Sequence, residues 1–113
     1  MDTFEKLKQL NKLRQAEWDS ENKIDLAFRG LEFMAECGEL AEQVKKFIRQ
    51  NNGLKGNTTD LSKILDEVGD AVITLTLLCA DIEELTGETI DISKAVQDKF
   101  NKTSNKYNFK TIW

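Results

Sequence analysis

Apolar side chains recur three and four residues apart along four segments of the chain, which is the spacing of one face of an α-helix. The helices are expected at about residues 3–18, 25–49, 58–85 and 92–106. Residues 58–60 are expected to cap the third helix, and Thr89 or Asp91 the fourth, because short polar side chains favour the position before a helix. Short links between four helices predict an all-α, antiparallel four-helix bundle, with residues 1–113 forming one domain.

The third helix is apolar on two sides between residues 71 and 80. Besides its main stripe, Ile73 and Leu77 form a second apolar side. Three other helices of a small chain can hardly cover both sides, and an exposed apolar patch marks an interface. The sequence therefore predicts self-association into a homodimer or a homotetramer.

The composition excludes several kinds of chemistry. Because the chain has no histidine, it cannot by itself form a histidine zinc site or a Ser-His-Asp triad. A net charge of −4 disfavours non-specific nucleic-acid binding. No stretch approaches the roughly 18 apolar residues of a membrane span, and Cys37 and Cys79 fit core thiols of a reducing compartment. We therefore expect a cytoplasmic protein that binds neither nucleic acid nor membranes.

Two acidic pairs occur at a spacing of three in the middle helices, Glu36 with Glu39 and Glu67 with Asp70. Residues three apart on a helix lie on one face, so each pair presents two carboxylates together. Two such pairs on facing helices would form the all-oxygen site that Mg²⁺ or Mn²⁺ prefers. Glu32 lies along the same edge as the first pair. The helical angles leave two interpretations open, a metal site and a structural cluster of acids.

Basic and aromatic residues suggest how a phosphorylated ligand would be held. Lys99, Lys102 and Lys106 recur at helical spacing near the end of the chain. Such a stripe either binds phosphates or is a solvated face near a helix C-terminus, where positive charge is favoured. Trp18 and Tyr107 offer aromatic faces on which a base can stack. For Trp18, packing along the first helix is the alternative.

Segments 35–42 (AECGELAE) and 66–73 (DEVGDAVI) resemble the paired ExxE and ExxD signature of MazG-like nucleotide pyrophosphohydrolases, which belong to the all-α NTP pyrophosphatase superfamily. Segments 14–18 (RQAEW) and 99–107 (KFNKTSNKY) are similar to parts of many members, most closely the small bacterial or phage type. The resemblance implies Mg²⁺-dependent hydrolysis of a nucleoside triphosphate to the monophosphate and pyrophosphate. A deoxy or non-canonical substrate, removed from the nucleotide pool, is expected.

The resemblance also implies roles for single residues. The metal ligands would be Glu36, Glu39, Glu67 and Asp70. The expected substrate contacts are Trp18, Lys99, Thr103, Lys106 and Tyr107, although many relatives have asparagine where this chain has Thr103. Without histidine the general base must be a carboxylate, and Glu32 and Glu39 are the nearest candidates. Two other classes stay open, a non-enzymatic helical interaction protein and a nucleotide- or cation-sensing protein without turnover.

Overall fold

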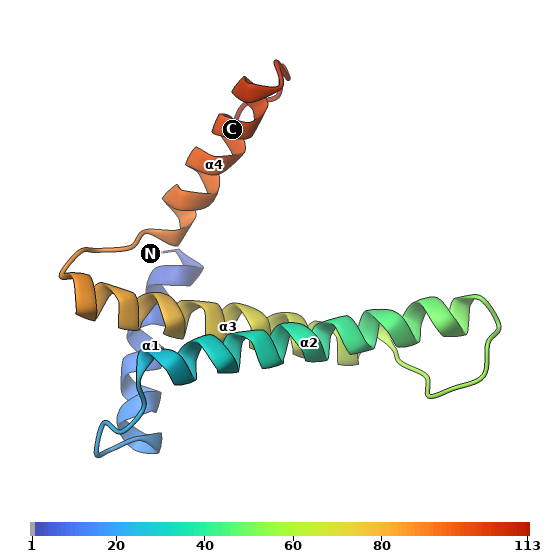
Figure 1. Cartoon of the computed structure of the whole chain (residues 1–113), viewed down its shortest axis with the longest axis horizontal. Coiled ribbons are helices and arrows are strands. Elements are labelled where there is room, and N and C mark those ends of the chain that lie inside the picture. The colour runs from blue at the N-terminus through green and yellow to red at the C-terminus, as the bar shows by residue number, and fades with distance from the viewer. Residues whose placement is uncertain (1) are drawn as a thin grey trace.

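The computed structural model describes residues 2–113, and this part of the chain folds into four helices without a strand (Figure 1). The helices are α1 (Thr3–Trp18), α2 (Leu26–Asn51), α3 (Leu61–Thr86) and α4 (Ile92–Lys106). The predicted all-α class is confirmed, and the bounds of α1 and α4 agree with the sequence pattern. Helix α2 continues two residues beyond its expected end, and α3 one residue.

Each helix begins after an aspartate whose carboxylate accepts a hydrogen bond from the backbone N–H three residues on, at 2.9 to 3.0 Å. These caps are Asp2, Asp25, Asp60 and Asp91. The choice between Thr89 and Asp91 is thus settled in favour of Asp91. At its other end α3 terminates at Gly87, which has a φ of 72° in the left-handed region that glycine adopts without strain.

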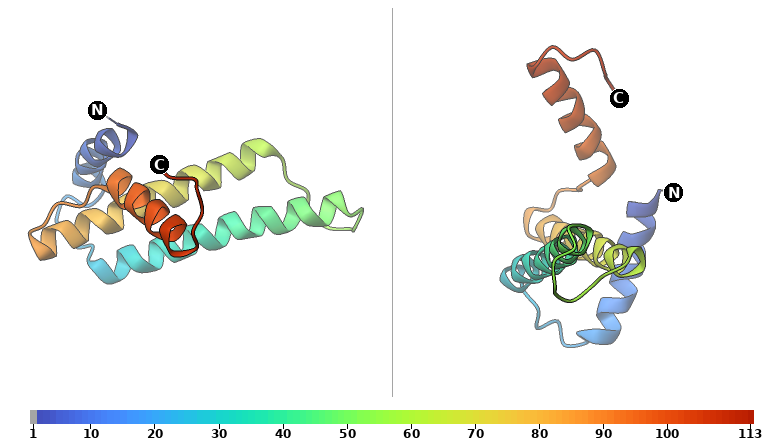
Figure 2. Two further views of the ribbon diagram at one scale, coloured as in Figure 1. Left: turned by 90° about the horizontal axis from the view of Figure 1, so that it is seen from above. Right: turned by 90° about the vertical axis from the view of Figure 1, so that its right-hand side faces the viewer.

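Helices α2 and α3 run antiparallel and side by side, joined by the loop at 52–60 (Figures 1 and 2). Thr59 anchors this loop from a buried position, because its hydroxyl bonds to Gln43 at 2.5 Å and its backbone N–H donates to the side chain of Gln50 at 2.8 Å. The loop therefore closes one end of the α2–α3 pair. The acidic residues of the two helices lie farther along the pair, away from this loop.

Helix α1 crosses α3 near the other end of the pair (Figure 1). The amide of Asn11 donates to the hydroxyl of Thr76 at 2.9 Å, and the ammonium of Lys8 pairs with Glu83 at 2.5 Å. Leu77 is buried beside this crossing, with 6% of its surface exposed. Leu77, which belongs to the second apolar side of α3, is thus buried within one chain beside α1. The sequence pattern had predicted that a second copy would cover this side.

Helix α4 leads away from the α2–α3 pair (Figures 1 and 2). Between its inner face and α3 lies an open, mostly apolar hollow of about 840 Å³, whose walls include Leu75 and Cys79 of α3 and Val96 and Phe100 of α4. Val96 and Phe100 are 49% and 42% exposed. The apolar face of α4 is therefore largely uncovered within the single chain.

The four helices do not enclose a common apolar core in one chain. Among the described residues, Leu77 is the one apolar side chain with less than a tenth of its surface exposed. The radius of gyration is 17.5 Å and the accessible surface 8601 Å². A compact domain of this length and mass has values of about 13 Å and about 6300 Å². Within residues 2–113, no helix is long and apolar enough to cross a membrane.

Candidate metal centre

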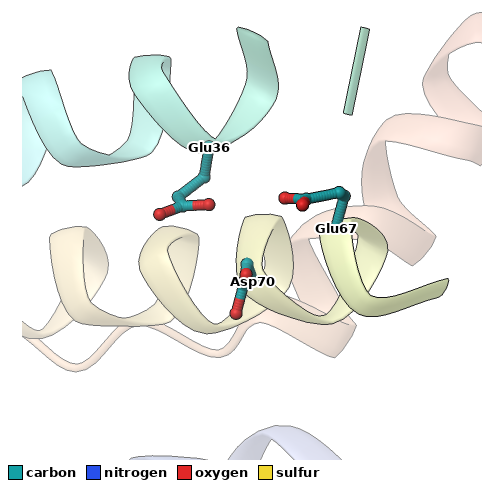
Figure 3. A group of neighbouring side chains, drawn as sticks. All are labelled: Glu36, Glu67 and Asp70. Atoms are coloured by element: carbon teal, nitrogen blue, oxygen red, sulfur yellow. The ribbon is translucent and has the colours of Figure 1, made fainter. Parts of the chain in front are cut away.

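Three carboxylates gather between the two long helices (Figure 3). Glu36 comes from α2, and Glu67 and Asp70 come from successive turns of α3. One carboxylate oxygen of each lies within 4.8 Å of the others. The spacing of three on α3 brings its two acids to one face, and the antiparallel pairing brings Glu36 opposite them. The three oxygens are close enough to bind one small cation.

The fourth predicted ligand, Glu39, lies beside this group on the exposed side of α2. Burial raises the pKa of Glu36, and the neighbouring charges of Glu39 and Asp70 raise it further. Burial also raises the pKa of Glu67, and the charge of Glu39 raises it further. The charges of Glu39 and Asp70 thus oppose the ionisation of Glu36 and of Glu67, in addition to the effect of burial.

Two oxygens of this group have no partner. Oε2 of Glu36 and Oε2 of Glu67 are inaccessible to solvent and accept no hydrogen bond. A buried carboxylate oxygen without a donor is unfavourable, because it has lost its water and gained nothing in return. A divalent cation would remove this deficit. An all-carboxylate set of donors on two facing helices fits Mg²⁺ or Mn²⁺, both of which prefer oxygen ligands.

Glu32 lies outside the group of three, although it is half-buried and stands one turn before Glu36 on α2. Its Oε1 accepts a hydrogen bond from Nη1 of Arg29 at 3.2 Å. Arg29, which is only 5% exposed, is not among the predicted site residues. The sequence spacing could have indicated its position, because Arg29 precedes Glu36 by seven residues, or about two helical turns, and so lies on the same face of α2.

The residues expected to contact the substrate lie on other elements. Trp18 ends α1, is 59% exposed, and has its ring centre 6.1 Å from that of Phe28. Lys99 and Thr103 line the hollow between α4 and α3. The ammonium of Lys106 lies 5.3 Å from the ring centre of Tyr107, at the exposed end of α4. Within one chain, α4 leads away from the α2–α3 pair (Figure 1), and it carries Lys99, Thr103 and Lys106.

Comparison with known proteins gives one family. The sequence profile of the MazG nucleotide pyrophosphohydrolase domain matches residues 30–109 of the 113-residue chain. Searches of the curated proteins and of the solved structures give no match. The matched region contains Glu36, Glu39, Glu67 and Asp70, as well as all of α4.

Proposed function

Because the chain belongs to the MazG nucleotide pyrophosphohydrolase family, we propose that it hydrolyses a nucleoside triphosphate to the monophosphate and pyrophosphate. The family supports a nucleotide pyrophosphohydrolase activity in general. The observation that carries the assignment to this site is the pair of buried carboxylate oxygens, on Glu36 and Glu67, that have no hydrogen-bond partner. A cation-dependent reaction on a triphosphate would need metal ligands of this kind.

We assign the ligands of a Mg²⁺ ion to Glu36, Glu39, Glu67 and Asp70, with Mn²⁺ as a substitute. When bound there, such a cation neutralises triphosphate charge and makes a coordinated water a better nucleophile. The protein holds the four carboxylates on two rigid helices, so that little reorganisation is needed when substrate arrives. Burial, and after it the charges of neighbouring acids, raises the pKa of Glu36 and of Glu67, and a bound cation would offset both effects, which supports this assignment.

The general base is assigned to Glu32. Glu39 interacts with both Glu36 and Glu67 and is better placed as a ligand. Glu32 stands one turn from Glu36 but outside the group of three, and its hydrogen bond to Arg29 engages only Oε1. Its Oε2 is left to accept a proton from the attacking water. Proton transfer to a positioned carboxylate of this kind typically accelerates a reaction by about 10² to 10⁴-fold.

The substrate is proposed to be a deoxy or non-canonical nucleoside triphosphate of the cytoplasmic pool. Its phosphates would be held by Lys99 and Lys106, its base would stack on Trp18 or Tyr107, and Thr103 would line the same path. Helix α4 leads away from the α2–α3 pair, which carries the acids of the same chain (Figure 1). We therefore propose that these lysines hold the phosphates of a substrate bound at the metal centre of a second copy, in a homodimer or homotetramer. The uncovered apolar face of α4 supports this arrangement.

The products distinguish attack at the α-phosphorus from loss of the γ-phosphate. We expect monophosphate and pyrophosphate in equal amounts when nucleoside triphosphates are incubated with the protein and Mg²⁺. In ¹⁸O-labelled water the label should enter the monophosphate, because in the proposed reaction water attacks the α-phosphorus and the bond to pyrophosphate breaks. Chromatography and mass spectrometry of the products check this. Release of orthophosphate and nucleoside diphosphate by the wild type, absent from a Glu67→Gln preparation, would contradict the proposal.

A further inference from the structure

Arg29 is a buried cation at the α1 end of the helix pair. Its guanidinium contacts side chains from three helices. Nη2 donates to Oε1 of Gln15 on α1 at 2.7 Å, and Nη1 donates to Glu32 on α2 at 3.2 Å. Nε lies 3.8 Å from a carboxylate oxygen of Asp81 on α3 and makes no hydrogen bond of its own. Burying a charged guanidinium costs free energy of solvation, which its ionic and hydrogen-bonded partners must offset.

The position of Arg29 in the helix connects this cluster to the acids. Arg29 and Glu36 are two turns apart on one face of α2, and Glu32 stands between them, one turn before Glu36. On α3, Asp81 follows Asp70 by eleven residues, about three turns, and therefore lies on the same face. The guanidinium and the metal centre thus lie along the same side of the α2–α3 pair, and on α2 Glu32 stands between Arg29 and Glu36.

A glutamate side chain next to this seam has several rotamers, and only some direct its carboxylate toward Glu36. The hydrogen bond from Nη1 selects among them while leaving Oε2 unengaged. The other arm of the planar guanidinium bonds to Gln15 on α1, so Arg29 also links α1 to the helix pair through a bond separate from the one to Glu32. The planar guanidinium donates charge-assisted hydrogen bonds in defined directions, so it can restrict the orientation of a carboxylate.

We propose that Arg29 is a positioning residue for the hydrolytic reaction, acting through Glu32. It holds the carboxylate of Glu32 at the edge of the metal centre with one oxygen free to take the proton of the attacking water. This inference rests on the proposed function and on the assignment of the base to Glu32. Groups that orient catalytic residues in this way typically change activity by about 10 to 100-fold when removed.

A double-mutant cycle on kcat tests the inference. We expect Arg29→Met to lower kcat by about 10 to 100-fold with little change in KM, and Glu32→Gln to lower it by at least as much. If Arg29 acts through Glu32, the double variant should fall no more than about twofold below Glu32→Gln alone, because the two changes remove the same contribution. Arg29→Lys keeps the charge and one donor, and should recover part of the loss.

Gln15→Met provides the matched control, because it removes the other partner of Arg29 and the link to α1 but leaves the Arg29–Glu32 bond. It should lower the melting temperature while kcat stays within about twofold of wild type. Equal losses of kcat in Gln15→Met and Arg29→Met, or additive losses in the cycle, would overturn the inference and leave the proposed function standing. If Arg29→Met does not fold, the same cycle is run with Arg29→Lys. An inactive wild type would overturn both proposals.

Discussion

Replacing Glu67 by glutamine is expected to remove both hydrolysis and the stabilisation of the protein by Mg²⁺. A cation that binds only the folded chain raises its stability by mass action, by about 2.7 kcal/mol at a hundredfold excess over Kd. Glu67 contributes one of the two partnerless buried oxygens, so its neutral amide leaves the ion without a ligand. We expect activity to fall by more than about 100-fold, and the apo fold to be intact or slightly firmer, since carboxylate repulsion is relieved.

Melting curves with and without Mg²⁺, together with calorimetric titration, measure this effect. Glu36→Gln should behave in the same way, because its Oε2 is the other partnerless oxygen. Glu42→Gln is the matched control, since Glu42 lies on the same helix but is paired with Lys45 at 2.9 Å on the solvent side. Unchanged Mg²⁺ binding in both Glu67→Gln and Glu36→Gln would exclude these acids as the metal site.

The chain is expected to sediment as a dimer or larger at low micromolar concentration. Its accessible surface exceeds that of a compact domain of equal mass by about 2300 Å², and α4 presents Val96 and Phe100 to an open hollow. Full burial of an apolar side chain of this size is worth about 1.5–3 kcal/mol, and Val96 and Phe100, at 49% and 42% exposed, forgo about half of that. Phe100→Glu should therefore dissociate the assembly, as analytical ultracentrifugation can show. Gln97→Glu, which adds the same charge at another exposed position of α4, should not.

Sharing of the site between copies has its own test. Glu67→Gln removes the metal centre, and Lys99→Gln removes a cation that we place at the centre of the other copy. If the two variants are mixed and allowed to exchange, random dimers should recover about a quarter of the wild-type sites, since half the dimers are mixed and each holds one complete site. A fully active wild-type monomer, or no recovery from exchanged dimers, would exclude the shared site.

The sequence was sufficient for the helices because their ends are specified locally. Asp25, Asp60 and Asp91 each supply the cap that starts a helix, and Gly87 supplies the left-handed residue that ends one. The gathering of Glu36 with Glu67 and Asp70 was also predictable. A spacing of three fixes the face of each pair, and one antiparallel contact brings the two faces together.

The sequence could not show which helix, from the same chain or from a second copy, packs against each apolar helix face. Periodicity identified Leu77 as needing cover, but only the crossing of α1 over α3 shows that the cover comes from within the chain. The burial of Arg29 could not be predicted from the sequence for a related reason. Its partners Gln15 and Asp81 are 14 residues before it and 52 residues after it, and a charged residue in a helix pattern is normally assigned to the solvent face.

The proposed metal site lies between α2 and α3, where the acids would bind the divalent cation that hydrolysis requires. Anomalous diffraction from crystals grown with Mn²⁺ tests it most directly, because the ion can be located without reference to activity. We predict a manganese peak within coordination distance of Glu36, Glu67 and Asp70, and its loss in crystals of Glu67→Gln. Manganese bound elsewhere, with these three carboxylates free of metal in a protein that still releases pyrophosphate, would contradict the account.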